Sequence, residues 1–266
     1  MKFTPNKSFG QHFLTSEKVV TDIIDDDQNS PFAIEKILEI GPGPGVLTNH
    51  LIKKDKPFKV IEIDDQFIAH LSDLVGSENI LQGDALRFNY NEILQGEDES
   101  YWLVSNLPYN IAGPLMAKLF CHPKIALMTL MMQKEMGEKM LKTSPKFKMN
   151  SLGLLSHCYF DVKKLCLVPP GSFSPPPKVD SIVLSFRKKH NPDIDFKIYP
   201  KLEAFGRNFF AHPRKQLMKN LKESYPHKDW KQAFEKSQVS LTIRAEACTH
   251  EQVLRLFNFW YEDGNN

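Results

Sequence analysis

The stretch Val104-Ser105-Asn106-Leu107-Pro108-Tyr109-Asn110 decides how the rest of this sequence is interpreted. The apolar run that leads into it, Tyr101 to Val104, predicts a buried strand that ends at a polar residue, a proline and an aromatic residue. In an open α/β sheet, ligands bind outside the carboxyl ends of the strands. We therefore expect this stretch to lie at a binding site.

Asn106, Leu107, Pro108 and Tyr109 form a group that suits methylation of an exocyclic amine on a base. The Asn106 carbonyl and a neighbouring main-chain carbonyl can each accept one hydrogen of an adenine N6 amine, while the Tyr109 ring stacks on the base. Accepting both hydrogens draws the nitrogen lone pair out of conjugation, so no strong general base is required. A plain turn is the alternative for a four-residue match taken by itself.

A glycine-rich turn, Gly41-Pro42-Gly43-Pro44-Gly45, follows the apolar run Ile37–Ile40 and precedes a predicted helix from about Val46 to Lys54. Glycines let the backbone approach a ligand closely, and the following helix offers free N–H groups. The spacing is G-x-G-x-G, two prolines stiffen the turn, and Glu39 stands just before it. These departures from the dinucleotide pattern favour a nucleoside that carries an amino-acid tail over a pyrophosphate.

Acidic residues close the next two predicted strands. The predicted strand Lys59–Asp64 ends in acids, and the Glu62 carboxylate there can accept from both ribose hydroxyls of either NAD or S-adenosylmethionine. Asp84 follows Asn79–Gln82 and can accept from an adenine amino group. With Asn106 on the fourth strand, the succession of strand ends indicates a class I methyltransferase and argues against a plain turn.

The remaining strands complete a mostly parallel, seven-stranded Rossmann-like sheet of the α/β class. Ile125–Met132 predicts a buried fifth strand, and Lys163–Val168 and Ser181–Phe186 predict the last two. The proline-rich connection between these last two is rigid, since each proline fixes its φ angle. A rigid connection can present Phe173 as a second stacking face opposite Tyr109.

A small helical domain is predicted after the linker Arg187–Pro192, which divides the chain into residues 1–190 and 191–266. If Arg214 to Glu223 is a helix, Lys215, Lys219 and Lys222 share one face that can follow RNA phosphates. A solvated lysine face is the usual alternative. Aromatic residues interleaved with these basic residues modestly favour RNA binding over a solvated face. They are Phe205, Phe209 and Phe210.

Composition and charge restrict the other classes of protein to which the chain could belong. The net charge is only +2, so nucleic-acid binding must depend on local patches, and Asp25-Asp26-Asp27 predicts a solvated acidic loop. The cysteines show no CxxC pair and no metal-ligand spacing, so we expect reduced thiols and no metal. The start Met1–Lys7 lacks an apolar signal region, and no run is long enough to cross a membrane. We expect a cytoplasmic protein.

Taken together, the sequence resembles the KsgA-like family of small-subunit ribosomal RNA adenine N6,N6-dimethyltransferases over nearly its whole length. The marks of the family are Phe9-Gly10-Gln11-His12-Phe13-Leu14, Glu39-Ile40-Gly41-Pro42-Gly43, Asn106-Leu107-Pro108-Tyr109, Gln133-Lys134-Glu135, the run from Phe173 to Ser181, Arg214-Lys215 and Arg244-Ala245-Glu246. Two features depart from it: many members have Asn in place of His12, and Met149–Gly153 replaces a Tyr-Gly-x-Leu-Ser form.

The resemblance implies S-adenosylmethionine as cofactor, the small ribosomal subunit with its 16S-type RNA as partner, and a monomer. It implies a target-adenine site of Asn106, the Leu107 carbonyl and Tyr109, with Phe173 opposite. The implied cofactor site consists of His12, Leu14, Gly41, Gly43, Glu62, Asp84, Ala85 and Asn106. Two alternatives stay open: a large-subunit methyltransferase of the antibiotic-resistance type, and a non-catalytic RNA-binding assembly factor.

Overall fold

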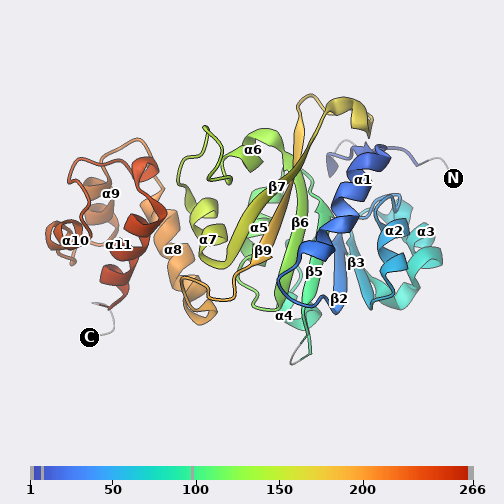
Figure 1. Cartoon of the computed structure of the whole chain (residues 1–266), viewed down its shortest axis with the longest axis horizontal. Helices are drawn as coiled ribbons and strands as arrows, with labels where there is room; N and C mark the ends of the chain where they lie inside the picture. The colour runs from blue at the N-terminus through green and yellow to red at the C-terminus, as the bar shows by residue number, and fades with distance from the viewer. Residues whose placement is uncertain (1–2, 7–8, 97–98, 263–266) are drawn as a thin grey trace. The chain divides into compact units, whose positions relative to one another are not determined.

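The computed structural model describes residues 3–6, 9–96 and 99–262 and divides into two compact units (Figure 1). The first unit comprises Met1–Gly137 and Phe160–His190, and the second comprises Glu138–Tyr159 and Asn191–Asn266. Assigning the whole of residues 1–190 to the first domain is therefore a prediction that needs correction. Residues 138–159 cluster with the second unit because their helix packs against helices that come after residue 190.

The first unit contains a seven-stranded sheet with its helices and a two-stranded ribbon. Its strands are β1 (Phe13–Leu14), β2 (Lys36–Ile40), β3 (Phe58–Glu62), β4 (Ile80–Gln82), β5 (Tyr101–Asn106), β6 (Ile125–Gln133), β7 (Phe160–Val168), β8 (Phe173–Ser174) and β9 (Ser181–Lys188). Its helical segments are α1 (Glu17–Ile24), η2 (Asp25–Asn29), α2 (Thr48–Leu51), η3 (Ile52–Lys54), α3 (Asp65–Val75), η4 (Ser77–Asn79), α4 (Tyr90–Ile93), α5 (Ala112–Leu119), most of α6 (Lys134–Glu138) and η5 (Pro170–Ser172).

The sheet has the strand order β4-β3-β2-β5-β6-β9-β7. Neighbours from β4 to β6 are parallel, while β9 pairs antiparallel with both β6 and β7. This confirms the predicted mostly parallel Rossmann-like sheet. Strands of such a sheet are covered on both faces and read as continuous apolar runs. Accordingly, eight of the nine residues of β6 are buried, and its methionines belong to the core.

The helix α1 covers one face of the sheet, and Figure 1 shows it running across the front of the strands. Its buried residues, Val19, Val20, Ile23 and Ile24, join one apolar cluster with residues of β2, β3, β5, β6, β7 and β9. Phe173 belongs to the same cluster. The apolar face of α1 thus attaches this amino-terminal helix to the sheet.

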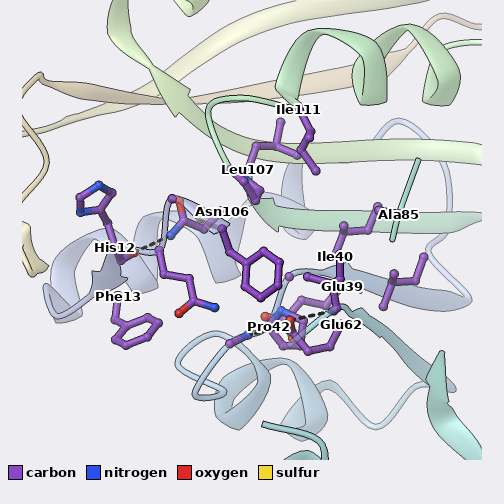
Figure 2. Close-up of a pocket in the computed structure, with 18 of the residues that line it drawn as sticks. His12, Phe13, Glu39, Ile40, Pro42, Glu62, Ala85, Asn106, Leu107 and Ile111 are labelled. Atoms are coloured by element: carbon purple, nitrogen blue, oxygen red, sulfur yellow. Dashed lines mark hydrogen bonds between the residues drawn. The ribbon is translucent and has the colours of Figure 1, made fainter. Parts of the chain in front are cut away.

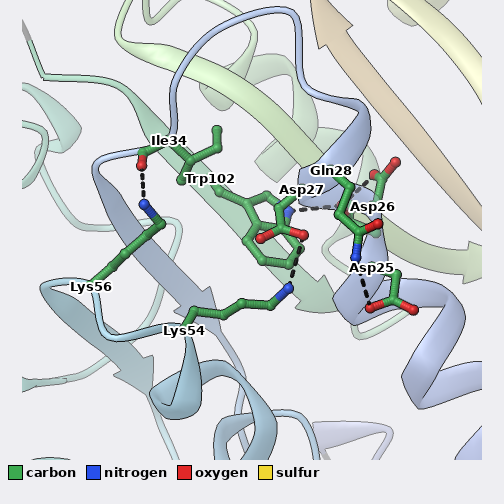
Figure 3. A network of polar contacts seen from close by, with 9 residues as sticks. Asp25, Asp26, Asp27, Gln28, Ile34, Lys54, Lys56 and Trp102 are labelled. Carbon is green, nitrogen blue, oxygen red and sulfur yellow. Dashed lines mark hydrogen bonds and ion pairs between the residues drawn. The ribbon is translucent and has the colours of Figure 1, made fainter.

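The prediction of a solvated acidic loop at Asp25–Asp27 is wrong. These residues form the 3₁₀ helix η2, and the Asp26 side chain is buried, with the residue 1% exposed. Asp26 accepts hydrogen bonds from Thr129 Oγ1 at 2.7 Å and Arg187 Nη2 at 3.2 Å. Asp27 pairs with Lys54 at 2.9 Å (Figure 3). Two of the three acids, Asp26 and Asp27, therefore anchor η2 to the rest of the unit, and only Asp25 is exposed.

Two predicted boundaries also need correction. The helix expected over Val46–Lys54 begins at Thr48, and its second half tightens to the 3₁₀ segment η3, which ends at Asp55 in a left-handed conformation. The expected linker Arg187–Pro192 begins later, because β9 continues to Lys188 along β6 and β7. Pairing with two strands outweighs the polar character of these residues.

The second unit is helical. Its elements are α7 (Ser151–Tyr159), η6 (Phe196–Ile198), α8 (Tyr199–Phe209), α9 (Leu217–Ser224), α10 (Trp230–Lys236), η7 (Ala245–Ala247) and α11 (His250–Glu262). Phe205 and Phe209 are fully buried in its core, where Phe205 contacts Phe257 and Trp260. The interpretation of these two rings as a sign of RNA contact is therefore wrong.

The basic helix expected over Arg214–Glu223 begins only at Leu217. Lys219 and Lys222 are exposed on α9, whereas Arg214 and Lys215 are exposed in the preceding turn. The turn is held by Leu217 N, which donates to Ile243 O at 2.9 Å. Among the described helices, none is long and apolar enough to cross a membrane.

Candidate active site

A cavity of about 270 Å³ opens at the carboxyl ends of β2, β3, β4 and β5. The strand β2 is followed in sequence by β3 on one side of it, whereas β5 lies on its other side. Ligands of open α/β sheets bind where the strand order reverses in this way. Figure 2 shows the lining side chains converging on this space from the strand ends and from the segment around His12.

The glycine turn forms one wall of the cavity. Gly41 and Gly43 have φ angles of +68° and +54°, a region that side chains with a Cβ rarely adopt. A Cβ built on Gly41 would meet no described atom within 4 Å, so this wall is bare backbone that faces open space. A Cβ on Gly43 would lie 3.7 Å from the Phe13 ring. The turn thus lets a ligand approach the main chain closely.

Glu62 fixes its carboxylate at the end of β3. Its Oε2 accepts from Gly43 N at 2.9 Å, and its Oε1 accepts from Ile63 N and Asp64 N, each at 2.8 Å. Burial raises the pKa of Glu62, and these three N–H bonds oppose that rise. A carboxylate has about four acceptor positions. Glu62 therefore keeps acceptor capacity for hydroxyl groups of a ligand.

The segment that carries His12 closes another side. Gln11 Nε2 donates to Asp64 Oδ2 at 2.7 Å, and Phe13 packs edge-on against Phe67 with ring centroids 5.8 Å apart. Both Gln11 and Phe13 line the cavity, although neither was predicted as a site residue. The apolar residues of the Phe9–Leu14 motif around them could have indicated this role.

Asn106 has a defined amide orientation. Its Nδ2 lies 3.1 Å from the main-chain oxygen of His12, as marked in Figure 2. Since a carbonyl oxygen can only accept, the amide nitrogen must face it, and Oδ1 is left to accept from another donor. The strand register supports this position, because Asn106 pairs with Met131 and Leu107 N donates to Met131 O at 3.0 Å.

Tyr109 lies beside Asn106 with its ring stacked on His12 at a centroid distance of 6.1 Å. Its hydroxyl is 2.7 Å from Ser181 Oγ. Burial raises the pKa of Tyr109, and the Ser181 hydrogen bond opposes the rise. The His12 Nδ1 atom lies 2.8 Å from Pro175 O, so this nitrogen carries the hydrogen.

Most predicted site residues meet at this cavity. The lining includes His12, Leu14, Gly41, Gly43, Glu62, Asp84, Ala85, Asn106, Leu107, Pro108 and Tyr109. Phe173 does not line it in this conformation: the residue is 5% exposed, β8 pairs it with Leu14 of β1, and its ring is part of the core. Phe173 was predicted as a second stacking face opposite Tyr109, but here it is a core residue and is absent from the cavity lining.

Glu39 is a cavity residue that the sequence analysis did not assign. It is buried, accepts from Thr48 Oγ1 at 2.7 Å, and has its pKa raised to about 8 by burial. In the unfolded chain a glutamate has a pKa of about 4.3. Glu39 therefore holds a proton in the folded state near neutral pH, and its burial costs folding free energy at higher pH.

Raising the pH is expected to destabilise the folded chain through Glu39. Because its folded pKa is raised, its contribution is fully present below the unfolded pKa and is lost as pH rises through about 8. Relative to Glu39→Gln, which has no titrating group there, the wild type should lose about 3–4 kcal/mol of unfolding free energy between pH 5 and 8. Urea unfolding of both proteins across this range measures the difference, and a constant difference would contradict it.

The fold and the cavity define a class I methyltransferase that uses S-adenosylmethionine as methyl donor. Within that class, the model of the ribosomal RNA adenine dimethylase family matches residues 2–262. The chain belongs to this family, which confirms the resemblance drawn from its motifs.

Curated relatives extend over almost the whole chain. The ribosomal RNA small subunit methyltransferase A of Malacoplasma penetrans is 32% identical, covering 97% of this chain and 93% of its own. Proteins of the same name from Clostridium acetobutylicum and Nitrosomonas europaea are 34% and 31% identical. These alignments cover 96% and 99% of this chain and 93% and 99% of the respective relatives.

Two solved structures share the fold. A dimethyladenosine transferase from Plasmodium falciparum aligns with a TM-score of 0.69 and 23% identity, covering 95% of this chain and 98% of its own. The 23S rRNA methyltransferase ErmE aligns with a TM-score of 0.66 and 24% identity, covering 93% and 98%. These two likenesses show that the chain shares its fold with both structures.

Proposed function

We propose that this chain methylates N6 of two adjacent adenosines near the 3' end of small-subunit ribosomal RNA, giving N6,N6-dimethyladenosine during biogenesis of the subunit. The observation that carries the proposal is the orientation of Asn106, whose Oδ1 is left to accept from an amine beside Tyr109. The names of the curated relatives support the choice of the small subunit.

The residues at the strand ends fit S-adenosylmethionine. Glu62 would accept from the ribose hydroxyls, Asp84 from the adenine amino group, and the bare turn at Gly41 and Gly43 leaves room for the amino-acid tail. His12 and Leu14 would cover the other side, with Ala85 against the adenine. The bound cofactor supplies an electrophilic methyl group on a sulfonium.

Asn106 and the Leu107 carbonyl orient the target amine. When each of the two carbonyls accepts a hydrogen bond from one N6 hydrogen, the nitrogen lone pair is free to attack in line. The Tyr109 ring stacks on the base, and the stacked base would exclude water from the reacting atoms. Orientation of this kind can supply several kcal/mol of barrier lowering without a strong base. In each transfer the N6–methyl bond forms as the methyl–sulfur bond of the cofactor breaks, and the amine then releases a proton to solvent. A second transfer from a fresh cofactor molecule gives the dimethylated product.

The target base must leave any stack to reach this cavity. We propose that Arg214, Lys215, Lys219 and Lys222 bind RNA phosphates; all four are exposed in the helical unit. Each phosphate contact adds to affinity without reading sequence. We further propose that the protein acts as a monomer in the cytoplasm.

The test is transfer of labelled methyl groups to separate, undermethylated small and large ribosomal subunits, followed by nucleoside mass analysis. We expect label as dimethyladenosine in the small subunit. Label confined to the large subunit would instead identify the resistance-type activity. RNA binding with no transfer to either subunit would indicate a non-catalytic assembly factor and overturn the proposal.

A further inference from the structure

Tyr109 is held by a residue that lies outside the cavity. Its hydroxyl is 2.7 Å from the Oγ of Ser181, the first residue of β9. Ser181 is 0% exposed, whereas Tyr109 is half-buried and lines the cavity. The hydrogen bond therefore connects a ring that can meet a ligand to a strand of the central sheet.

The first residue of β9 is fixed by the strands on either side of it. Ser181 pairs with Gln133 at the end of β6 and with Val168 at the end of β7. Antiparallel pairing with both neighbouring strands fixes the register of Ser181. The hydroxyl that meets Tyr109 thus occupies a defined position.

The helix α6 contacts the two residues that flank Ser181. Lys134 N donates to Asp180 O at 3.0 Å, and Lys134 Nζ lies 3.0 Å from Asp180 Oδ2. At Gly137, a Cβ would come within 2.3 Å of the Ile182 side chain. The Gln133-Lys134-Glu135 motif, which the proposed chemistry leaves unused, therefore leads into a helix packed tightly against the residues that flank Ser181.

We propose that Ser181 is a positioning residue for methyl transfer, and this inference rests on the proposed function above. Its hydroxyl limits rotation of the Tyr109 ring, so that the base stacks with its amine at Asn106. Without the bond, the ring still has the His12 stack on one side, but its hydroxyl end has lost its fixed partner. Misplacement of the base by less than an ångström is enough to slow an oriented attack.

The test is a double-mutant cycle with Ser181→Ala, Tyr109→Phe and the combination. Each single variant is expected to lower the single-turnover rate on undermethylated small subunits by about three- to ten-fold, as loss of one hydrogen bond suggests. Because both changes remove the same bond, the combined variant should be no slower than the slower single variant. Binding of S-adenosylmethionine, measured by calorimetry, should stay within about two-fold of wild type.

Two more variants separate positioning from general loss of structure. Ser181→Thr keeps the hydroxyl and should recover most of the rate. Ser156→Ala is the matched control, since it also deletes a buried serine hydroxyl, one whose bond to Gly153 O at 3.2 Å closes within α7. It should transfer methyl groups at the wild-type rate.

The inference is overturned if Ser181→Ala matches wild type, if the two single effects multiply in the combined variant, or if threonine gives no recovery. In each of these cases the wild-type enzyme still methylates the small subunit, so the proposed function stands. If wild type transfers no methyl group to the small subunit, the proposed function fails and takes this inference with it.

Discussion

Replacing Asn106 with alanine is expected to reduce methyl transfer by about 100- to 1,000-fold, the range seen when one preorganised polar contact to a reacting group is removed. The expectation follows from the bond between Asn106 Nδ2 and His12 O, which leaves Oδ1 to accept from the target amine. Without that acceptor, the amine is held by one carbonyl and rotates out of line with the methyl group. Single-turnover rates at saturating S-adenosylmethionine measure the loss.

Asn106→Asp is the informative companion to the alanine variant. Aspartate keeps an oxygen acceptor of the same shape, but it cannot donate to the His12 carbonyl, and its charge faces that carbonyl at about the same distance. We expect its rate to fall well below that of wild type as well. Calorimetry should show measurable cofactor binding by both variants, because Glu62 and the glycine turn are unchanged. Near-normal turnover of either variant would contradict the mechanism.

The strands of the sheet could be predicted because their apolar runs are long and continuous. Ile125–Met132 differs from the observed β6 by one residue, and its buried pattern needs no knowledge of distant partners. The strand ends at Gly41, Glu62, Asp84 and Asn106 could be placed together for the same reason. Parallel strands bring their carboxyl ends to one edge, so a correct strand order also brings the side chains together.

The errors occur where a residue's environment is set by a distant segment. Phe173 turns into the core because β8 pairs with β1, about 160 residues earlier in the chain. Phe205 and Phe209 alternate with basic residues in sequence, yet the helical period places them on the buried side of α8. Ser181 was predicted only as the end of a motif and the start of a strand, since nothing local shows that its hydroxyl reaches Tyr109.

Asp26 shows the same limit most clearly, and it carries the largest expected effect on stability. Three consecutive acids usually indicate a solvated loop. Here the middle one is fixed by Thr129, 103 positions away, and by Arg187, 161 positions away. Trp102 Nε1 donates to the same Thr129 hydroxyl at 2.8 Å, so one network joins η2, β5, β6 and β9.

Asp26→Ala is expected to destabilise the sheet unit by about 3–5 kcal/mol, the usual cost of removing one partner of a buried ion pair. The Arg187 side chain, 16% exposed, would keep its charge without the carboxylate, and Thr129 would lose its acceptor. Asp25→Ala is the matched control, because it makes the same change of charge at an exposed position in η2.

Hydrogen exchange followed by mass spectrometry suits this test better than a single melting curve, since a chain with two compact units need not unfold in one step. Peptides from β5 and β6 should exchange about 150- to 5,000-fold faster in Asp26→Ala than in Asp25→Ala, by conversion of the free-energy cost above. Peptides from α8 and α11 should not change. If β6 exchanges equally in both variants, Asp26 is not an anchor of the sheet. In that case Thr129→Val should also leave the exchange of β6 unchanged. This variant removes the hydroxyl that links Asp26 to Trp102 while it preserves the side-chain volume.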